Sequence, residues 1–334
     1  MIFEDFWFYQ LELACITASI EVGLFSFLDG KKLHYCDIAK GLQLYDYALE
    51  PLLLNLTQMG FILKDQDHYS CTAESMILLS AKSEFYRGDY FVDEEKLYIE
   101  ERLIQFLKTG SAPLVEQGKS YSEMWEKGDI DQNTANGFTG NMHSLMKYTS
   151  FINAKNEDFS QQKHIVDIGG GSGAWALALT KQHPHLKVTI FDLPPVINAA
   201  QNILSLEDAS ISERIKFVPG NFFQDPFPRD ADSFLLSNIL HDWPIPQCKT
   251  LLKRISMATP QGGKLYIHEC ILDPEKTSPK FSVLFHLLMA MNHRAQQFTK
   301  SELDDLLQTS GYQRSELLGV NRKYSLLSAK VMKQ

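Results

Sequence analysis

A run of glycines stands between an apolar segment and a helix-like segment in the middle of the chain. It reads Ile165-Val-Asp-Ile-Gly-Gly-Gly-Ser-Gly-Ala-Trp. Gly169, Gly171 and Ala174 satisfy the GxGxxG/A pattern, and Gly169, Gly171 and Gly173 equally satisfy GxGxG. Glycines let the backbone turn sharply and approach a ligand closely. The pattern therefore indicates a nucleoside-binding loop, with a tight turn that holds no ligand as the alternative.

The acidic residues around this loop indicate the charge of the ligand. Asp192 ends the next predicted strand about 20 residues after Gly171, where an acid can accept both hydroxyls of a ribose. Asp167 precedes the glycines, and no Lys or Arg occurs in residues 165–180. A carboxylate at that position repels a pyrophosphate and attracts a sulfonium or an amino group. We therefore favour S-adenosylmethionine over a nicotinamide dinucleotide.

A histidine follows a later apolar segment directly, in Leu240-His-Asp-Trp. Ligands of parallel sheets bind outside the carboxyl ends of the strands, so we expect His241 beside the cofactor. A phenol with a pKa near ~10 is a weak nucleophile, and a histidine with an ordinary pKa of ~6.5 can accept its proton. We assign His241 as a general base and Asp242 as an orienting or substrate-contacting group. A structural or simply exposed histidine is the alternative.

The elements that position these residues alternate between strands and helices from about residue 163 onward. The expected strands are residues 163–169, 187–192, 215–219, 233–238, 264–269, 314–320 and 324–331. Helical segments connect most of them. This alternation is typical of an α/β domain with a parallel sheet covered on both faces.

The first hundred residues have a different pattern of expected secondary structure. We expect helices at residues 6–28, 35–41 and 47–59 and a hairpin at residues 61–64 and 69–72. Two helices followed by a hairpin are typical of a winged helix, which often binds DNA. The helix expected at 47–59 would be the DNA-reading one, but Asp46 and Glu50 lie at its start and no Lys or Arg occurs from Asp46 until Lys64. Because phosphate contacts need basic side chains, a dimerisation or packing role is favoured over DNA binding.

Composition limits the class of protein. The 334 residues carry 32 Lys and Arg against 41 Asp and Glu, a net charge of −9. An acidic surface argues against nucleic acid or an anionic membrane as a partner. Glu12 and Glu21 interrupt the apolar N-terminal stretch, which argues against a membrane span. The cysteines are scattered and odd in number, which is typical of reduced cytoplasmic thiols without a zinc site. They are Cys15, Cys36, Cys71, Cys248 and Cys270.

Three motifs in this order resemble one family. They are Val166-Asp-Ile-Gly-Gly-Gly-Ser-Gly, Phe191-Asp-Leu-Pro and Asn238-Ile-Leu-His-Asp-Trp. The chain is similar, over nearly its whole length, to class I S-adenosylmethionine-dependent O-methyltransferases of the caffeate/hydroxyindole type. The resemblance implies a Rossmann-like doubly wound sheet of seven strands, the last one antiparallel. It also implies a winged-helix-like dimerisation domain at 1–100, connecting helices at 101–160 and the catalytic domain at 161–334.

The resemblance also implies the residues that hold the cofactor. The glycines would face its methionine part, Asp192 the ribose, and Leu193 and Phe222 the adenine. Asn221 stands where the family has an adenine-binding acid, and Ser237 where it has a lysine. The implied cofactor site comprises Asp167, Gly169, Gly171, Gly173, Asp192, Leu193, Asn221, Phe222 and Ser237.

Two glutamates that flank the catalytic histidine in the plant enzymes are missing. Gln297 and, approximately, Leu327 stand at their positions. Without them, an imidazolium loses the carboxylates that stabilise it. Either Asp242 or Glu269 compensates, or catalysis rests on alignment of the reactants. A third possibility is a different reaction, such as a pericyclic, hydroxylating or decarboxylating one that transfers no methyl group.

The substrate side is expected to be apolar. Phe138 and Met142 match a pattern that shields the substrate in relatives, and His293-Arg294 would place a cation over it. Core packing and a favourable helix C-terminus are the respective alternatives. The expected substrate-binding residues are Phe138, Met142, Trp243, Leu288, Met289, Asn292, His293, Arg294 and Gln297. No cluster of three acids occurs near His241, so we expect no metal.

Together these features predict a cytoplasmic homodimeric enzyme. It would methylate a hydroxyl of a small aromatic or polyketide-like natural product and release S-adenosylhomocysteine. One alternative is an enzyme of the same fold that retains its cofactor. The other is a ligand-responsive DNA-binding regulator that uses the winged-helix domain.

Overall fold

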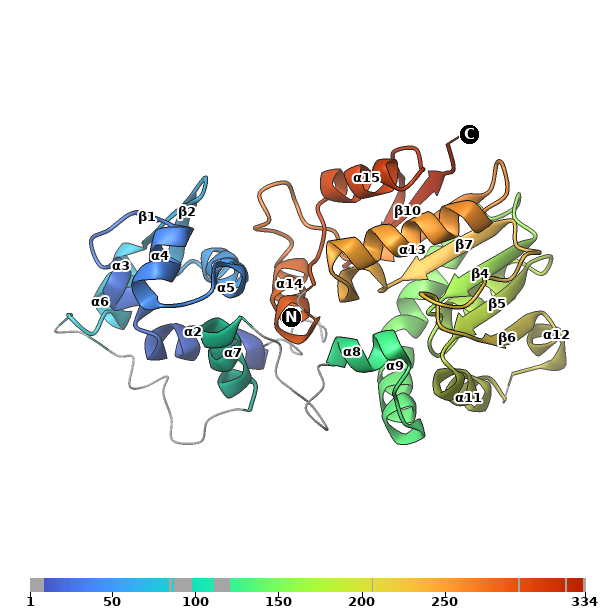
Figure 1. Ribbon diagram of the computed structural model, residues 1–334, viewed down its shortest axis with the longest axis horizontal. Coiled ribbons are helices and arrows are strands. Elements are labelled where there is room, and N and C mark those ends of the chain that lie inside the picture. The colour runs from blue at the N-terminus through green and yellow to red at the C-terminus, as the bar shows by residue number, and fades with distance from the viewer. Residues whose placement is uncertain are drawn as a thin grey trace. The chain divides into compact units, whose positions relative to one another are not determined.

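The computed structural model describes residues 9–83, 86, 98–110, 121–205, 207–293, 295–321 and 323–332. The chain forms two compact units (Figure 1). The first contains Met1–Tyr121 and Leu272–Thr299, and the second contains Ser122–Ile271 and Lys300–Gln334. The segment Leu272–Thr299 therefore groups with the N-terminal region, although the expected boundaries assign it to the domain at 161–334.

A seven-stranded sheet forms the centre of the second unit, in the order β6-β5-β4-β7-β8-β10-β9. The strands are β4 (His164–Ile168), β5 (Lys187–Asp192), β6 (Ile215–Pro219), β7 (Ser233–Ser237), β8 (Lys264–Glu269), β9 (Glu316–Asn321) and β10 (Tyr324–Lys330). Strands β6, β5, β4, β7 and β8 are mutually parallel, whereas β10 runs antiparallel to both β8 and β9. The predicted fold class, a Rossmann-like sheet that ends in an antiparallel strand, is confirmed.

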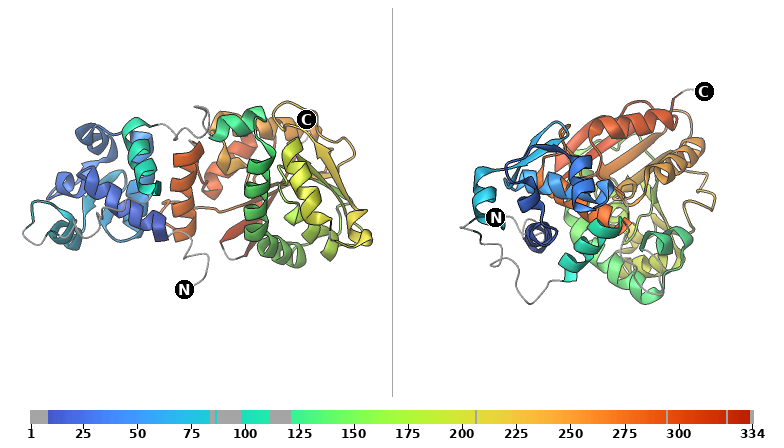
Figure 2. Two further views of the ribbon diagram at one scale, coloured as in Figure 1. Left: turned by 90° about the horizontal axis from the view of Figure 1, so that it is seen from below. Right: turned by 60° about the vertical axis from the view of Figure 1, so that its left-hand side comes forward.

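Helices cover this sheet on both faces. They are α8 (Tyr121–Lys127), α9 (Gln132–Asn156), α10 (Ala174–Gln182), α11 (Pro194–Leu204), α12 (Ala209–Ser212), α13 (Ile245–Ala258) and α15 (Lys300–Thr309). Helix α9 packs on α10 and α11, while α13 packs on α15. The sheet lies between these two groups (Figures 1 and 2). Strand β4 is buried along its whole length, as apolar strands between two layers of helices are.

The first unit is helical with a small antiparallel sheet of order β1-β3-β2. Its elements are α2 (Tyr9–Glu21), α3 (Leu24–Leu28), β1 (Leu33–His34), α4 (Tyr35–Leu42), α5 (Asp46–Gln58), β2 (Ile62–Asp65), β3 (His68–Cys71), α6 (Ala73–Leu79), α7 (Tyr98–Thr109) and α14 (Lys280–His293). The expected helix at 6–28 is divided into α2 and α3, because Gly23 takes a left-handed conformation with φ of 73°. Helix α4 ends at a left-handed Gln43 instead of Gly41.

Helix α14 joins the first unit by packing on α5. The Asn55 amide of α5 donates a hydrogen bond to the carbonyl of Val283 at 3.2 Å. Leu54, Leu272 and Val283 form a small buried cluster beside it. Apolar burial and this hydrogen bond together explain why a segment distant in sequence belongs to the N-terminal core. In the part of the chain that the structure describes, no helix combines the length and apolar character of a membrane span.

Candidate active site

The glycine loop leaves β4 and enters α10 through three left-handed residues. Gly169, Gly171 and Gly173 have φ of 63°, 53° and 74°. A Cβ at Gly169 would collide with the side chain of Ile239, and one at Gly173 would lie 2.6 Å from Ile190 Cδ1. Only glycine fits these positions without strain, which confirms the physical reason for the run of glycines.

Asp192 at the end of β5 ties this loop to the neighbouring strand. Its Oδ2 accepts the Gly171 backbone N–H at 2.8 Å, and its Oδ1 accepts the Leu193 N–H at 2.7 Å. Burial raises the pKa of this carboxyl to about 6, although the two N–H donors lower it. Each oxygen of a carboxylate keeps a further lone pair, so Asp192 retains the capacity to accept ribose hydroxyls.

Asp167, the penultimate residue of β4, has no such donors. The residue is 1% exposed, and neither carboxyl oxygen has a hydrogen-bond partner among the described residues. Burial and then the charge of Asp192 raise its pKa to about 8. Since an unpaired buried carboxylate is costly, the position fits a ligand that supplies a cationic N–H group. The α-amino group of S-adenosylmethionine is such a group, and no basic side chain competes for it between residues 165 and 180.

Aromatic rings lie beside the glycine loop near Gly169. Phe222 lies 3.6 Å from the position of a Cβ on Gly169. Trp243, which is 5% exposed, meets the rings of Phe222 and Phe223 edge to face, with centroids 5.7 Å and 4.7 Å apart. Trp243, an expected substrate residue, thus packs against Phe222, an expected cofactor residue.

Asn221 has two of its side-chain hydrogen bonds inside the protein. Its Nδ2 donates to the Glu126 carbonyl at 2.8 Å, and its Oδ1 accepts the Phe223 N–H at 2.9 Å. These bonds fix the turn after β6 and link it to α8. One amide N–H remains for a ligand, since a carboxamide carries two.

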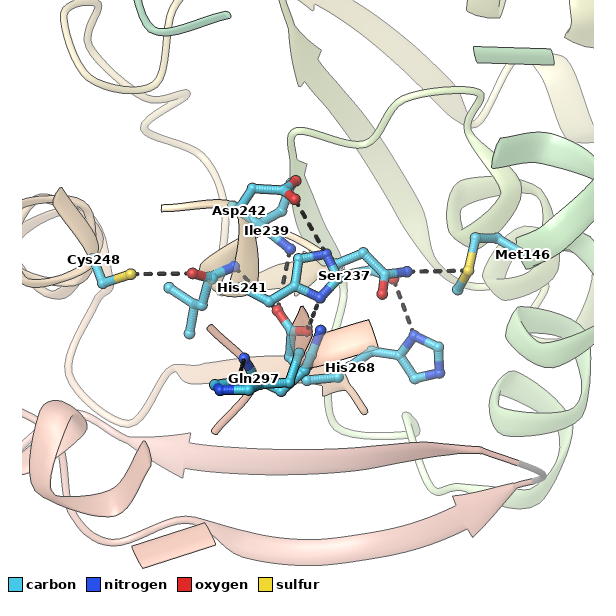
Figure 3. A network of polar contacts seen from close by, with 12 residues as sticks. Met146, Ser237, Ile239, His241, Asp242, Cys248, His268 and Gln297 are labelled. Atoms are coloured by element: carbon cyan, nitrogen blue, oxygen red, sulfur yellow. Dashed lines mark hydrogen bonds and ion pairs between the residues drawn. The ribbon is translucent and has the colours of Figure 1, made fainter. Parts of the chain in front are cut away.

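His241 lies in a 3-10 turn, Leu240–Asp242, directly after β7. Its Nδ1 is 3.0 Å from Oε2 of Glu269, and its Nε2 is 3.4 Å from Oδ1 of Asp242. Figure 3 shows the carboxylate of Asp242 directed at the ring of His241. The side chains of His241 and Glu269 are only 3% and 1% exposed. An imidazole with a buried carboxylate on one nitrogen is arranged to accept a proton on the other.

Glu269 is itself held by the backbone of the turn. Its Oε1 accepts the N–H groups of Ile239 at 3.2 Å and Leu240 at 3.0 Å. The parallel register pairs Ser237 with His268, so β7 and β8 end at the same edge and Glu269 reaches the turn. Glu269 was one of two residues expected to compensate for the missing glutamates. Of the two, it is the one that lies on Nδ1 of His241.

Asp242 adds a second carboxyl on the opposite nitrogen. Burial raises its pKa to about 6, with His241 lowering it and Glu269 raising it further. Its side chain keeps 27% of its surface exposed, so it stays open to a substrate or to water. Asn238, which begins the turn, takes a left-handed φ of 53° and donates from its Nδ2 to the Met146 sulfur at 3.1 Å.

The remaining expected substrate residues belong to different elements. Phe138 on α9 is 37% exposed and its ring lies 4.9 Å from that of Trp125, while Met142 on the same helix is half-buried. Leu288 of α14 packs against the core of the first unit, and Met289 is buried.

Other expected substrate residues carry less structural information. Gln297 is buried, and its backbone N–H donates to Nδ1 of His286 at 3.1 Å. Asn292 and His293 end α14, but their side chains, like Arg294, lie outside the described residues. Among the described side chains, no group of three or more His, Cys, Asp or Glu has an arrangement that would hold a metal ion.

One residue beside the glycine loop was missed. Nδ1 of His143 lies 3.0 Å from Oγ of Ser172, which is a buried residue of the loop. Partial burial and Lys147 lower the pKa of this histidine. Its position directly after Met142 on α9 was the available signal, since α9 packs along α10.

Comparison with known proteins identifies the family. A sequence model of the O-methyltransferase domain matches residues 109–313. The chain is 30% identical over 299 residues to the 3-hydroxy-5-methyl-1-naphthoate 3-O-methyltransferase of Streptomyces sahachiroi, covering 89% of this chain and 84% of that one.

Solved structures share the fold at lower identity. An O-methyltransferase family 2 protein from Planctomyces limnophilus, in complex with apigenin, superposes with a TM-score of 0.80 at 21% identity, covering 98% of this chain and 94% of that one. Human N-acetylserotonin methyltransferase in complex with S-adenosylmethionine gives 0.64 at 22% identity, covering 98% and 96%.

The family match thus defines a methyltransferase that uses S-adenosylmethionine. The chain belongs to the O-methyltransferase family. The predicted family, enzyme class and cofactor are confirmed.

Proposed function

We propose that this protein transfers the methyl group of S-adenosylmethionine to a hydroxyl of a small aromatic or polyketide-like molecule, with His241 as the general base. The observation that carries the proposal is the contact between Nδ1 of His241 and the buried carboxylate of Glu269 at 3.0 Å. A neutral imidazole whose proton is kept on Nδ1 by a nearby carboxylate has a lone pair on Nε2. That lone pair can accept the proton of a substrate hydroxyl.

The chain's residues then have distinct tasks. When bound, S-adenosylmethionine supplies an activated methyl group on a sulfonium. Asp167 binds its amino group and Asp192 binds its ribose. The glycine loop lets the backbone approach the cofactor closely. His241 receives the hydroxyl proton on Nε2, where the nearby carboxylate of Asp242 favours the cationic ring. General base catalysis of this kind contributes about 10²–10⁴-fold.

Glu269 takes the part of the glutamates that are missing at Gln297 and Leu327. The backbone N–H groups of Ile239 and Leu240 donate hydrogen bonds to its Oε1 and hold its carboxylate in place. A carboxylate held beside the ring by these two N–H groups is positioned to stabilise an imidazolium. The absence of the two plant-type glutamates is therefore compatible with base-assisted methyl transfer.

The substrate class rests on relatives. The relative from Streptomyces sahachiroi carries the name of a hydroxynaphthoate 3-O-methyltransferase, and the structure from Planctomyces limnophilus holds apigenin. Both named molecules are flat and bear phenolic hydroxyls. We propose a substrate of this kind, with Phe138 and Met142 of helix α9 as residues that contact it.

Mass spectrometry tests the proposal directly. The protein is incubated with S-adenosylmethionine and a panel of hydroxynaphthoates, flavones and polyketide phenols. We expect a product heavier by one CH₂ and an equal amount of S-adenosylhomocysteine. An isomerised, hydroxylated or decarboxylated product with the cofactor unchanged would overturn O-methylation and establish the cofactor-retaining alternative.

We also propose that the protein is a homodimer that pairs through its N-terminal unit. Large apolar side chains are exposed there, including Leu13, Leu63 and Ile77. Helix α5 is an unsuitable DNA reader, because residues 51–56 are all buried and its first turn is acidic. Light scattering is expected to give twice the mass of the chain. A monomer at assay concentrations, or sequence-selective DNA binding in a gel shift, would contradict this proposal.

A further inference from the structure

A second buried histidine lies next to Glu269 on β8 and has no part in the base catalysis described above. His268 is fully buried. Its ring stacks on Tyr324 with centroids 4.7 Å apart and meets Trp175 edge to face at 5.0 Å. These two aromatic contacts fix the plane of the imidazole. Nε2 of His268 contacts Asn153, whereas Nδ1 contacts Ser237 and, at 3.4 Å, the indole nitrogen of Trp175.

The contact with Asn153 determines which nitrogen of His268 carries the proton. Nδ2 of Asn153 donates to the Thr149 carbonyl at 2.9 Å, and Oδ1 of Asn153 accepts from Nδ2 of Asn321 at 2.6 Å. The amide orientation is thereby set, and the second N–H of Nδ2 points to Nε2 of His268 at 3.2 Å. Nε2 must therefore accept, and the neutral ring carries its proton on Nδ1.

This tautomer determines the polarity of the Ser237 hydroxyl. Nδ1–H of His268 donates to Oγ of Ser237 at 3.0 Å (Figure 3). The indole N–H of Trp175, which can only donate, lies 3.1 Å from the same oxygen and 3.4 Å from Nδ1 of His268. Because Nδ1 carries the ring proton, the indole donates to the serine oxygen. A serine oxygen has two lone pairs, and both are then used. The hydroxyl proton is left to donate, and no acceptor for it occurs among the described residues.

We propose that His268 is a positioning residue that makes Ser237 an obligatory hydrogen-bond donor to the bound cofactor. Ser237 is the last residue of β7, at the carboxyl edge where the glycine loop and His241 also lie. Its acceptor is an oxygen or a ring nitrogen of S-adenosylmethionine. The inference rests on the proposed placement of the cofactor at this edge of the sheet. Ser237 is already among the cofactor residues that the family resemblance implies, so what is added is the direction of its hydrogen bond and the residue that sets this direction.

The test measures binding of S-adenosylhomocysteine by calorimetry to the full chain and to three variants. We expect Ser237→Ala and His268→Leu to weaken binding by about 3- to 10-fold, the size of one net hydrogen bond. His268→Asn restores an N–H close to the position of Nδ1, so its affinity should recover toward that of the unchanged protein. In turnover assays, the KM for S-adenosylmethionine should rise more than kcat falls.

The double variant Ser237→Ala with His268→Leu separates positioning from general destabilisation. If His268 acts through Ser237, the double variant binds no more weakly than Ser237→Ala alone. Ile267→Val, at the adjacent buried residue of β8, is the matched control, and thermal melting of all variants reports folding. Additive losses, or an equal loss in Ile267→Val, would overturn the proposal.

A shorter ligand locates the acceptor. 5′-Methylthioadenosine lacks the amino-acid part, so a loss that persists with this ligand places the acceptor on the nucleoside, and a loss that vanishes places it on the amino-acid part. Either result supports the donor role. Unchanged binding in Ser237→Ala and His268→Leu, together with lost binding in Asp192→Ala, would reject the inference alone. Unchanged binding in Asp192→Ala would reject the cofactor placement itself.

Discussion

Two buried histidines at the carboxyl edge of the sheet differ in what surrounds them. His241 is 2% exposed and lies within 3.0 Å of Glu269 and 3.4 Å of Asp242. His268 is equally buried, but its nitrogens contact only Asn153, Ser237 and the indole of Trp175. Burial lowers the pKa of His268 to about 3. Burial alone keeps an imidazole neutral, whereas added carboxylates enable it to accept a proton.

One strand separates these two environments. His268 and Glu269 are consecutive residues of β8, and successive side chains of a strand point to opposite faces. His268 therefore meets Asn153 of α9 and Trp175 of α10, while Glu269 reaches the turn that carries His241. We therefore propose that one strand end supports proton transfer on one side and a fixed hydrogen-bond donor on the other.

The largest expected loss of activity follows from removing the imidazole of His241. His241→Ala should lower kcat by about 10²–10⁴-fold, because the substrate hydroxyl loses its proton acceptor. Calorimetry with S-adenosylhomocysteine should show unchanged affinity, which separates the base from the cofactor site. Full turnover in His241→Ala would remove the general-base assignment.

A second substitution makes the two histidines alike. Glu269→Gln replaces the carboxylate beside Nδ1 of His241 by a neutral amide, whereas His268 already has a neutral amide, that of Asn153, beside its Nε2. We expect kcat to fall by roughly 10- to 100-fold, the size that partners orienting a functional histidine contribute. Asp242→Asn is the matched control on the other nitrogen, and its effect should be smaller because Asp242 is partly exposed. Equal losses in both variants would contradict the special role of Glu269.

A similar contrast in hydrogen-bond partners distinguishes the two carboxyl groups beside the glycine loop. Asp192 accepts two backbone N–H groups, whereas Asp167 accepts none from the described residues. Asp192→Ala should weaken binding of S-adenosylhomocysteine roughly tenfold through lost bonds to the ribose. Asp225, which accepts the Asn221 N–H outside the loop, offers the control Asp225→Asn. Unchanged affinity in Asp192→Ala would exclude it from the ribose site.

The smallest effect concerns the pH dependence that Asp167 creates. Its pKa is raised from the ordinary 3.8 to about 8 in the folded protein. The folded state therefore holds this proton more tightly, so its contribution to stability is complete below pH ~4 and is lost as the pH rises through about 8. We expect the Tm of the ligand-free protein to fall over this range, and to fall less in Asp167→Asn.

Ligand binding should reverse this protonation. A cationic amino group beside Asp167 favours the carboxylate, so binding at pH 7 should release a proton. Calorimetry in buffers of different ionisation enthalpy measures that release. A proton release that is the same in Asp167→Asn would show that another group is responsible.

Several features could be predicted from sequence because they depend on neighbours along the chain. The glycine run follows its strand directly, Asp192 ends the next strand, and His241 follows β7. Their positions at one edge follow from strand-helix alternation, since parallel strands end at the same edge. Glu269 was recognised only as one of two options, because the length of β8 and its register against β7 decide whether its carboxylate reaches the turn.

Amino-acid sequence by itself thus determined the sheet, the class of cofactor and the candidate base, since each depends on local pattern. Tertiary structure alone decided that Leu272–Thr299 joins the N-terminal unit, that Glu269 lies beside Nδ1 of His241, and that Nδ1 of His268 lies beside Oγ of Ser237. These outcomes depend on strand register and on side-chain direction between segments far apart in the chain. Hydrophobic periodicity records which face of an element is buried, but not which residue it meets there.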